Sequence, residues 1–309
     1  MKNSFKFRPQ TLTLIPALLA VSACSPTSPT GFSAGAPSEH TPQSYEKTSS
    51  TAASTSTLGG SASVLVALSG ADTAESASSA AVTGSVTHDT GRIELDDGTY
   101  LFIDADGFDG SGNLSDGAGA TGSRTDVSGA SFAGSYDYVV PFLLRHKTTG
   151  RDHLTLGVAG LITASSDMPS GGSAVYTGES WAYGGAAGSE YGYGSGTSTV
   201  SVNFGAGTAN VVMGGFSVHQ SGTAVTAADA PLDQIKGTGL VISGAHFTGG
   251  NWVTLKNGAV VNVVGAGAVT TSNGTFFGYD SSISGPDEVA GVVTSVSSTG
   301  FLSGVYIAD

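Results

Sequence analysis

The stretch EVAGVVTSVSSTGFLSGVYI, residues 288–307, decides the fold class. It contains two apolar runs, Val289–Val296 and Phe301–Ile307, separated by a short turn of serine, threonine and glycine. Short apolar runs divided by such turns are typical of antiparallel β-strands. The pattern continues backwards to Ala81, with one strand roughly every ten residues.

Further predicted strands of the second half are Ala174–Trp181, Ser198–Phe204, Ala209–Val218, Ile235–Ser243, Trp252–Leu255, Ala259–Val264 and Gly274–Gly278. In the first half, the dipeptide Asp97-Gly98 predicts a tight hairpin, and a second hairpin turns at Thr149-Gly150. The Ala/Ser-rich stretch 71–81 fits either a loop or a short helix. Glycine supplies 47 residues and charged residues only 11%, which also favours β-structure. The sequence therefore predicts an all-β chain, either a barrel or a sandwich.

The amino terminus resembles a lipoprotein leader. A basic start precedes the apolar run Leu12–Val21, which is shorter than the ~20 residues that a membrane-spanning helix needs. The string Val21-Ser22-Ala23-Cys24 resembles a lipobox. We expect a signal peptide over residues 1–23, cleavage after Ala23 and lipidation of Cys24. Residues 24–60 are rich in serine, threonine and proline, and are expected to form a flexible tether.

Charge and cysteine content exclude several classes of protein. Loss of the leader removes three basic residues and leaves 8 basic against 24 acidic residues, a formal net charge of −16. Such an acidic surface repels phosphate backbones, so no nucleic-acid partner is expected. Cys24 is the single cysteine of the chain, so an internal disulfide is excluded.

Three segments of the second half carry a resemblance to a known family. They are Met168–Gly178, Val202–Thr208 with the strand that follows, and residues 274–306, which contain Gly-Thr-Phe-Phe-Gly and Glu-Val-Ala-Gly. In this order they resemble the β-barrel domain of the transferrin-binding protein B family of surface lipoproteins. The chain departs from the family pattern at Tyr279, where proline is usual, and at Ala290, where glycine is usual.

The resemblance implies a carboxyl-terminal antiparallel β-barrel of about eight strands over residues 168–309, preceded by a β-rich, handle-like segment over residues 61–167. Glycines such as Gly278 and Gly291 suit sharp bends in the curved strands of such a barrel. Five aromatic residues are expected to fill the barrel interior: Phe204, Phe216, Phe276, Phe277 and Phe301. An integral membrane barrel is disfavoured, because aromatic residues are only 8% of the chain.

A group of basic residues at one hairpin tip is the most distinctive local charge. It comprises Arg145, His146, Lys147, Arg151 and His153. One interpretation is a contact patch for an acidic partner, and the other is an ordinary solvated hairpin end. His146 and His153 could also face each other across the hairpin and hold a metal or haem iron.

An acidic loop offers a second candidate site. Asp104, Asp106 and Asp109 follow one another at a spacing that resembles a calcium loop. Phe108 occupies the position of an expected ligand, so a solvated loop is the alternative interpretation.

Two short motifs of enzymes are chance matches in this context. Gly31–Gly35 matches a serine nucleophile elbow but lies in the tether, and Gly117–Gly122 matches a dinucleotide loop without the required flanking strand and helix. We predict no enzyme and no cofactor. The predicted function is a lipid-anchored lipoprotein of the outer-membrane surface, which captures a host or environmental protein or an iron carrier and passes it to an outer-membrane receptor. The alternatives are a structural or adhesive surface lipoprotein and a periplasmic enzyme.

Overall fold

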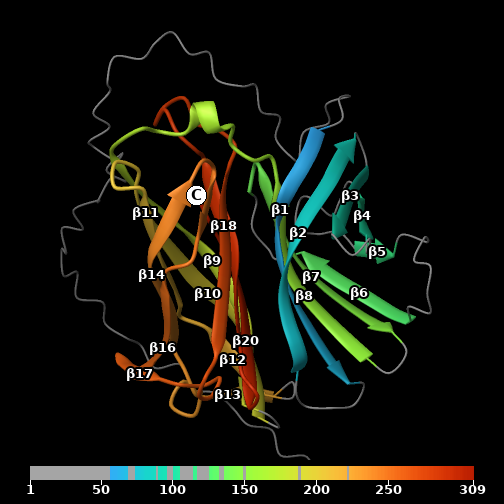
Figure 1. Ribbon diagram of the computed structural model, residues 1–309. Coiled ribbons are helices and arrows are strands. Elements are labelled where there is room, and N and C mark those ends of the chain that lie inside the picture. Colours follow the sequence, from blue (N-terminus) through green and yellow to red (C-terminus); the bar gives the residue numbers. More distant parts are fainter. Residues whose placement is uncertain are drawn as a thin grey trace, which may run out of the picture.

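The computed structural model describes residues 56–68, 74–87, 90–95, 100–104, 114–116, 125–131, 136–148, 151–186, 189–220 and 223–309 (Figure 1). These residues form two antiparallel β-sheets and a short 3-10 helix, Ser165–Asp167. None of the described elements is an α-helix, which confirms the predicted all-β class. Within the described ranges, no helix has the length and apolar character needed to cross a membrane.

The first sheet has eight strands in the order β5-β4-β3-β2-β1-β8-β7-β6. Their bounds are β1 Ser56–Leu68, β2 Ala74–Thr87, β3 Thr90–Leu95, β4 Tyr100–Asp104, β5 Leu114–Asp116, β6 Thr125–Ser131, β7 Val139–Thr148 and β8 Arg151–Gly160. The stretch 71–81, predicted as a loop or a short helix, lies largely in β2, so that prediction was wrong. Its small residues pair with β1 in a long hairpin that matches Ala62 with Ala80. Strand β1 also begins before residue 60, the predicted end of the tether.

The second sheet closes into the predicted eight-stranded barrel. Its strands are β9 Ser173–Ala186, β10 Ser189–Asn203, β11 Thr208–Gly214, β12 Ser217–Gln220, β13 Thr223–Val225, β14 Gln234–Ser243, β15 His246–Thr248, β16 Asn251–Lys256, β17 Ala259–Val261, β18 Val269–Phe277, β19 Glu288–Val296 and β20 Gly300–Ala308. The ring runs β9-β20-β19-β18-β15-β14-β11-β10 and returns to β9. Closure gives every strand of this ring two neighbours, which removes most of the free edge that would allow edge-to-edge aggregation.

Two hairpins extend the ring at one end. The hairpin β12–β13 pairs with the first part of β10, and the hairpin β16–β17 pairs with the first part of β14. The predicted strand Ala209–Val218 is therefore two strands, β11 and β12. They are separated at Gly215, whose φ of +67° breaks the extended backbone.

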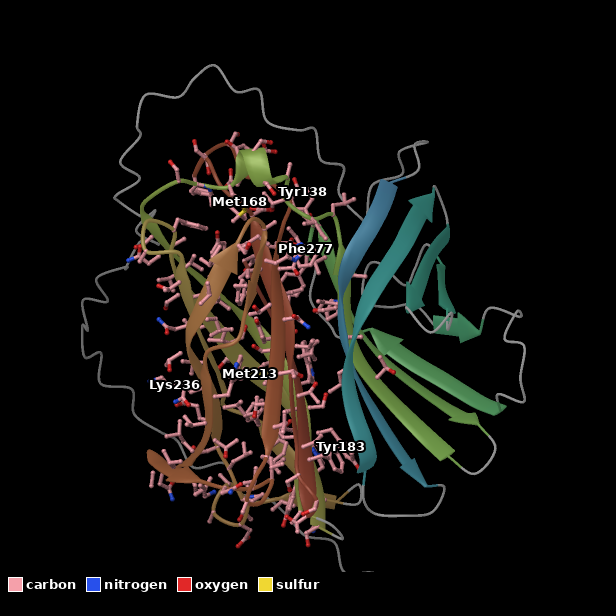
Figure 2. All side chains as sticks on the ribbon, in the orientation of Figure 1. Tyr138, Met168, Tyr183, Met213, Lys236 and Phe277 are labelled. Atoms are coloured by element: carbon pink, nitrogen blue, oxygen red, sulfur yellow. The ribbon has the colours of Figure 1, made fainter. Side chains whose placement is uncertain are left out.

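The barrel interior is filled by a continuous apolar core. Phe276 is fully buried in it, with ring centroids 5.7 Å from Phe204 and 5.2 Å from Phe247. Met213, labelled in Figure 2, is fully buried in the same core. The predicted interior positions of Phe204 and Phe276 are confirmed, and Phe216 packs partly buried against the core.

The outer face of β18, β19 and β20 is buried as well, because the eight-stranded sheet packs against it. Phe277 shares this second core with Val292 and Val305 of the barrel and with Leu156 and Val158 of β8. The prediction that Phe277 fills the barrel interior was therefore wrong, and Figure 2 shows it beside Tyr138 between the two sheets.

Phe301 also differs from the prediction. It alternates with Leu302, which belongs to the interior core, and its ring lies 5.6 Å from Tyr183. Successive side chains of a strand point to opposite faces, so Phe301 lies on the outer face. Both faces of β20 are buried over its whole length, which explains why neither face is polar.

Gly278 allows the two sheets to approach closely at this junction. It has a φ of +63°, and a Cβ there would lie 2.2 Å from the Tyr138 ring. Gly291 allows a close approach within the barrel, since a Cβ there would lie 2.5 Å from the backbone oxygen of Asn273 on β18. Both positions therefore exclude a side chain, and Gly278 makes the bend that was predicted for it.

Candidate functional site: an apolar groove at one end of the barrel

The barrel wall is incomplete where the β16–β17 hairpin lies. Strand β14 pairs with β16 through Gln234–Thr238 and with β15 through Val241–Ser243. On the side of β15, β18 is paired only from Asn273 to Thr275. Among the described residues, the first part of β18 therefore pairs with β19 on one side and with no strand on the other, and the outer edge of β17 is also unpaired.

A groove with a volume of about 360 Å³ lies at this opening. Its walls come from the β16–β17 hairpin, from the connection 262–268 and from the inner face of the barrel. The side chains that line it are mainly apolar and include Ile235, Trp252, Val260, Val261, Val293 and Leu302. Small-molecule sites in proteins span about 300–1,000 Å³ and are mostly apolar, so this groove has the size and character of the smallest of them.

The connection 262–268 is held in place by the turn between β19 and β20. The hydroxyls of Ser297 and Thr299 both donate to the backbone oxygen of Val264, and the Thr299 bond measures 3.4 Å. The side-chain oxygen of Asn262 accepts the backbone N–H of Gly265 at 2.8 Å. These hydrogen bonds fix the connection 262–268, so this wall of the groove does not need a ligand to hold its position.

Trp252 forms the opposite wall. Its indole N–H donates to the backbone oxygen of Gly249 at 3.0 Å. Its ring lies over Gly237, where a Cβ would come within 2.7 Å of the ring. The glycine at this position of β14 therefore allows the indole to lie flat against the strand.

The lipidation and calcium predictions fall mostly outside the described residues. Ala23, Cys24, Asp106 and Asp109 lie outside them, and Asp104 is the last residue of β4. The groove shares no residue with either prediction. Within the described ranges, no group of three or more His, Cys, Asp or Glu side chains is arranged to hold a metal ion.

The basic group lies on the β7–β8 hairpin, as predicted. The register pairs His146 directly with His153, Lys147 with Asp152 and Thr148 with Arg151. Arg145 lies on β7 opposite Leu154. Four of the five basic positions therefore lie among the last three residue pairs of the β7–β8 hairpin. That this basic group contacts a partner stays a prediction.

A buried carboxylate, Glu288 at the start of β19, joins the barrel to the segment that leads into β7. Its two oxygens accept the backbone N–H groups of Asp137 and Tyr138, and the Tyr138 bond measures 3.0 Å. Burial raises the pKa of Glu288 to about 8, and the two N–H donors oppose this rise because they favour the ionised form. Glu288 belongs to the Glu-Val-Ala-Gly segment quoted above, but sequence reasoning did not predict its contact with the first sheet.

The fold was compared with solved structures. The chain is similar to intact Ap-TbpB (N and C lobes). The identity is 12%, the TM-score is 0.41, and the match covers 82% of this chain and 76% of that chain. A double mutant of the vaccine antigen Transferrin Binding Protein B from Haemophilus parasuis Hp5 matches at 14% identity and a TM-score of 0.44, over 74% of this chain and 53% of that one.

Isotype 1 Transferrin binding protein B from serogroup B Neisseria meningitidis matches at 14% identity and a TM-score of 0.43, over 75% of this chain and 59% of that chain. The chain thus spans between one half and two thirds of the length of these last two proteins. Membership of their family does not follow from similarity at this level. No protein-family model and no curated protein matches the chain.

Proposed function

We propose that this chain is a lipid-anchored binding lipoprotein of the outer-membrane surface, which captures a protein or iron-source ligand without catalysis. The packed barrel interior is the observation that carries the proposal. Phe276 and Val211 are fully buried inside the ring, where side chains pack the interior around them. We therefore place the contact with the ligand on the outer surface of the chain, which suits a protein ligand.

The basic hairpin supports a contact with an acidic partner. The mature chain carries a net charge of −16, and the β7–β8 hairpin gathers three of its eight Lys and Arg residues. Opposite charges on two partners speed their association and orient it. The proposed partner accordingly presents an acidic surface to Arg145, Lys147 and Arg151. An outer-membrane receptor that takes over the cargo is the second partner of the proposal.

Ligand capture is tested on the chain from Ser25 to Asp309 by thermal unfolding with haem, haemoglobin, transferrin or calcium. A ligand that binds only the folded chain stabilises it by about 2.7 kcal/mol at a hundredfold excess over the dissociation constant. We expect one iron carrier to raise the midpoint, and Lys147→Ser to weaken this shift. Lys236→Ser is the matched control, because Lys236 lies on the side of the barrel away from the first sheet (Figure 2).

No shift with any carrier would contradict iron-source capture and favour the adhesive alternative, in which deletion of the chain abolishes cell aggregation or attachment. A shift with calcium alone would assign a role to Asp104, Asp106 and Asp109. If Lys147→Ser and Lys236→Ser reduce the ligand-induced midpoint shift equally, the β7–β8 hairpin is excluded as the contact patch.

The anchor is tested separately in cells. Cys24→Ser is expected to abolish incorporation of labelled palmitate, because the thiol that takes the lipid is lost. Protease added to intact cells is expected to digest the unmodified protein, while a periplasmic marker stays intact. Full protection of the chain would place it inside the outer membrane and contradict surface capture.

A further inference from the structure

The chemistry of the groove differs from that of the surrounding surface. The chain carries 24 acidic residues, yet the residues that line the groove include no Asp, Glu, Lys, Arg or His. We propose that the groove binds a single aliphatic chain of a lipid-like amphiphile and leaves the polar head at its mouth. This inference goes beyond the capture of a protein ligand and does not depend on it.

The polar side chains of the lining are already hydrogen-bonded within the protein. The hydroxyl of Thr254 donates to the backbone oxygen of Val261 at 2.5 Å, and the hydroxyls of Thr270 and Ser295 bond each other at 2.9 Å. Asn262 accepts two backbone N–H groups of its own loop. A sugar, nucleotide or amino acid needs convergent polar partners, whereas an aliphatic chain needs none.

The apolar surface continues from the groove to its rim. Val260, which lines the groove, is 69% exposed. It is one of the four large apolar side chains that are most exposed among the described residues. A bound aliphatic chain would cover this side chain and gain the free energy of removing its apolar surface from water.

The walls are formed before the ligand arrives. The hydroxyls of Ser297 and Thr299 hold the connection 262–268 from one side, and Trp252 is fixed by its bond to Gly249 on the other. A site with fixed walls loses little conformational entropy on binding. The volume of about 360 Å³ suits one chain and is small for a paired-chain lipid.

The test uses the chain from Ser25 to Asp309 and the uncharged fluorescent probe 1-N-phenylnaphthylamine, displaced by saturated fatty acids below their micelle concentrations. Each added methylene is expected to strengthen binding about fourfold until the groove is full, after which affinity no longer rises with length. Dodecanoate and dodecylphosphocholine should bind within about tenfold of each other, because the head is not contacted. A larger preference for one head would overturn the proposed mode of binding.

Two matched pairs of variants locate the site. Ala268→Trp fills the groove and Val260→Asp places a charge at its mouth, and each is expected to weaken probe binding by at least about tenfold. Ala266→Trp changes an exposed alanine of the same connection outside the lining, and Val175→Asp changes a valine that is 63% exposed on β9. Both controls should bind as the unmodified chain does.

The proposal is overturned if the unmodified chain does not enhance the probe fluorescence, or if all four variants bind it equally. Circular dichroism shows whether each variant is folded. If Val260→Asp does not fold, Ala268→Trp and its control still decide the outcome, because Ala268 is exposed and tolerates a larger side chain.

Discussion

Raising the pH from 5 to 8 is expected to lower the free energy of unfolding, and Glu288→Gln is expected to remove most of this dependence. Burial raises the pKa of Glu288 from its ordinary value of 4.5 to about 8 in the folded chain. Between these two values the folded state keeps a proton that the unfolded state has lost. Stability from this group is therefore complete below about pH 4.5 and is lost as the pH rises through about 8.

The expected size of the effect follows from the same linkage. One group contributes at most about 1.4 kcal/mol per pH unit, which gives a loss on the order of 2–4 kcal/mol over this window. Urea unfolding at a series of pH values measures it. Burial lowers the pKa of His246, so protonation of this group makes the folded chain less stable as the pH falls below about 6.5. The effect of Glu288 is therefore measured as the difference in unfolding free energy between the unmodified chain and Glu288→Gln at each pH.

Asp229→Asn is the control for this measurement. Asp229 is exposed in the turn that follows β13, where it accepts the hydroxyl of Thr226 at 2.5 Å. Asp229→Asn removes one negative charge from an exposed position, so it controls for the change in net charge that Glu288→Gln also makes. If Glu288→Gln keeps the full slope, the dependence arises from another group, such as Glu179, whose pKa is also raised by burial.

Truncation of Phe277 is expected to weaken the packing between the two sheets more than the packing inside the barrel. Phe277 has no exposed surface, and it packs between the barrel and the first sheet. Phe277→Ala is expected to cost about 3–5 kcal/mol, the usual range for a buried phenylalanine. Hydrogen exchange should accelerate most in β7 and β8, because the cavity lies beneath them, while β11 and β14 on the far side of the ring stay protected.

Phe276→Ala is the matched control, since it removes the neighbouring ring from the barrel interior. Phe276 contacts Phe204, Phe247 and Tyr176 and is equally buried. A similar loss of stability is expected, with faster exchange in β11 and β14. If both variants accelerate hydrogen exchange in the same strands, the barrel interior and the core between the two sheets form a single cooperative unit and are not energetically separate.

Phe276 and Phe277 show which features of the fold can be predicted from the sequence and which cannot. The spacing of apolar runs and turns predicted most barrel strands to within a few residues, because each run and its flanking glycines are local signals. It could not tell which of Phe276 and Phe277 points inward. Alternation identifies an inner face only when the other face is polar. Here the barrel core buries the inner face of β18, β19 and β20, and the first sheet buries their outer face.

Other features depend on pairing between distant segments. The small residues of β2 have little strand preference of their own and form a strand by pairing with β1. The groove joins Ile235, Trp252 and Leu302, which are far apart in the chain and share no motif. Glu288 stood in a segment that was singled out, but its partners at Asp137 and Tyr138 lie about 150 residues earlier.

The closure of the ring also has a consequence for synthesis. The last strand, β20, pairs with β9 through Gly178 and Ala308, so the first and the last strands of the barrel meet. A ribosome must complete nearly the whole chain before these residues can pair, and contacts of such long sequence separation form slowly. The ring therefore closes only after β20 has been made, so its other strands must wait for this last strand before the barrel is complete.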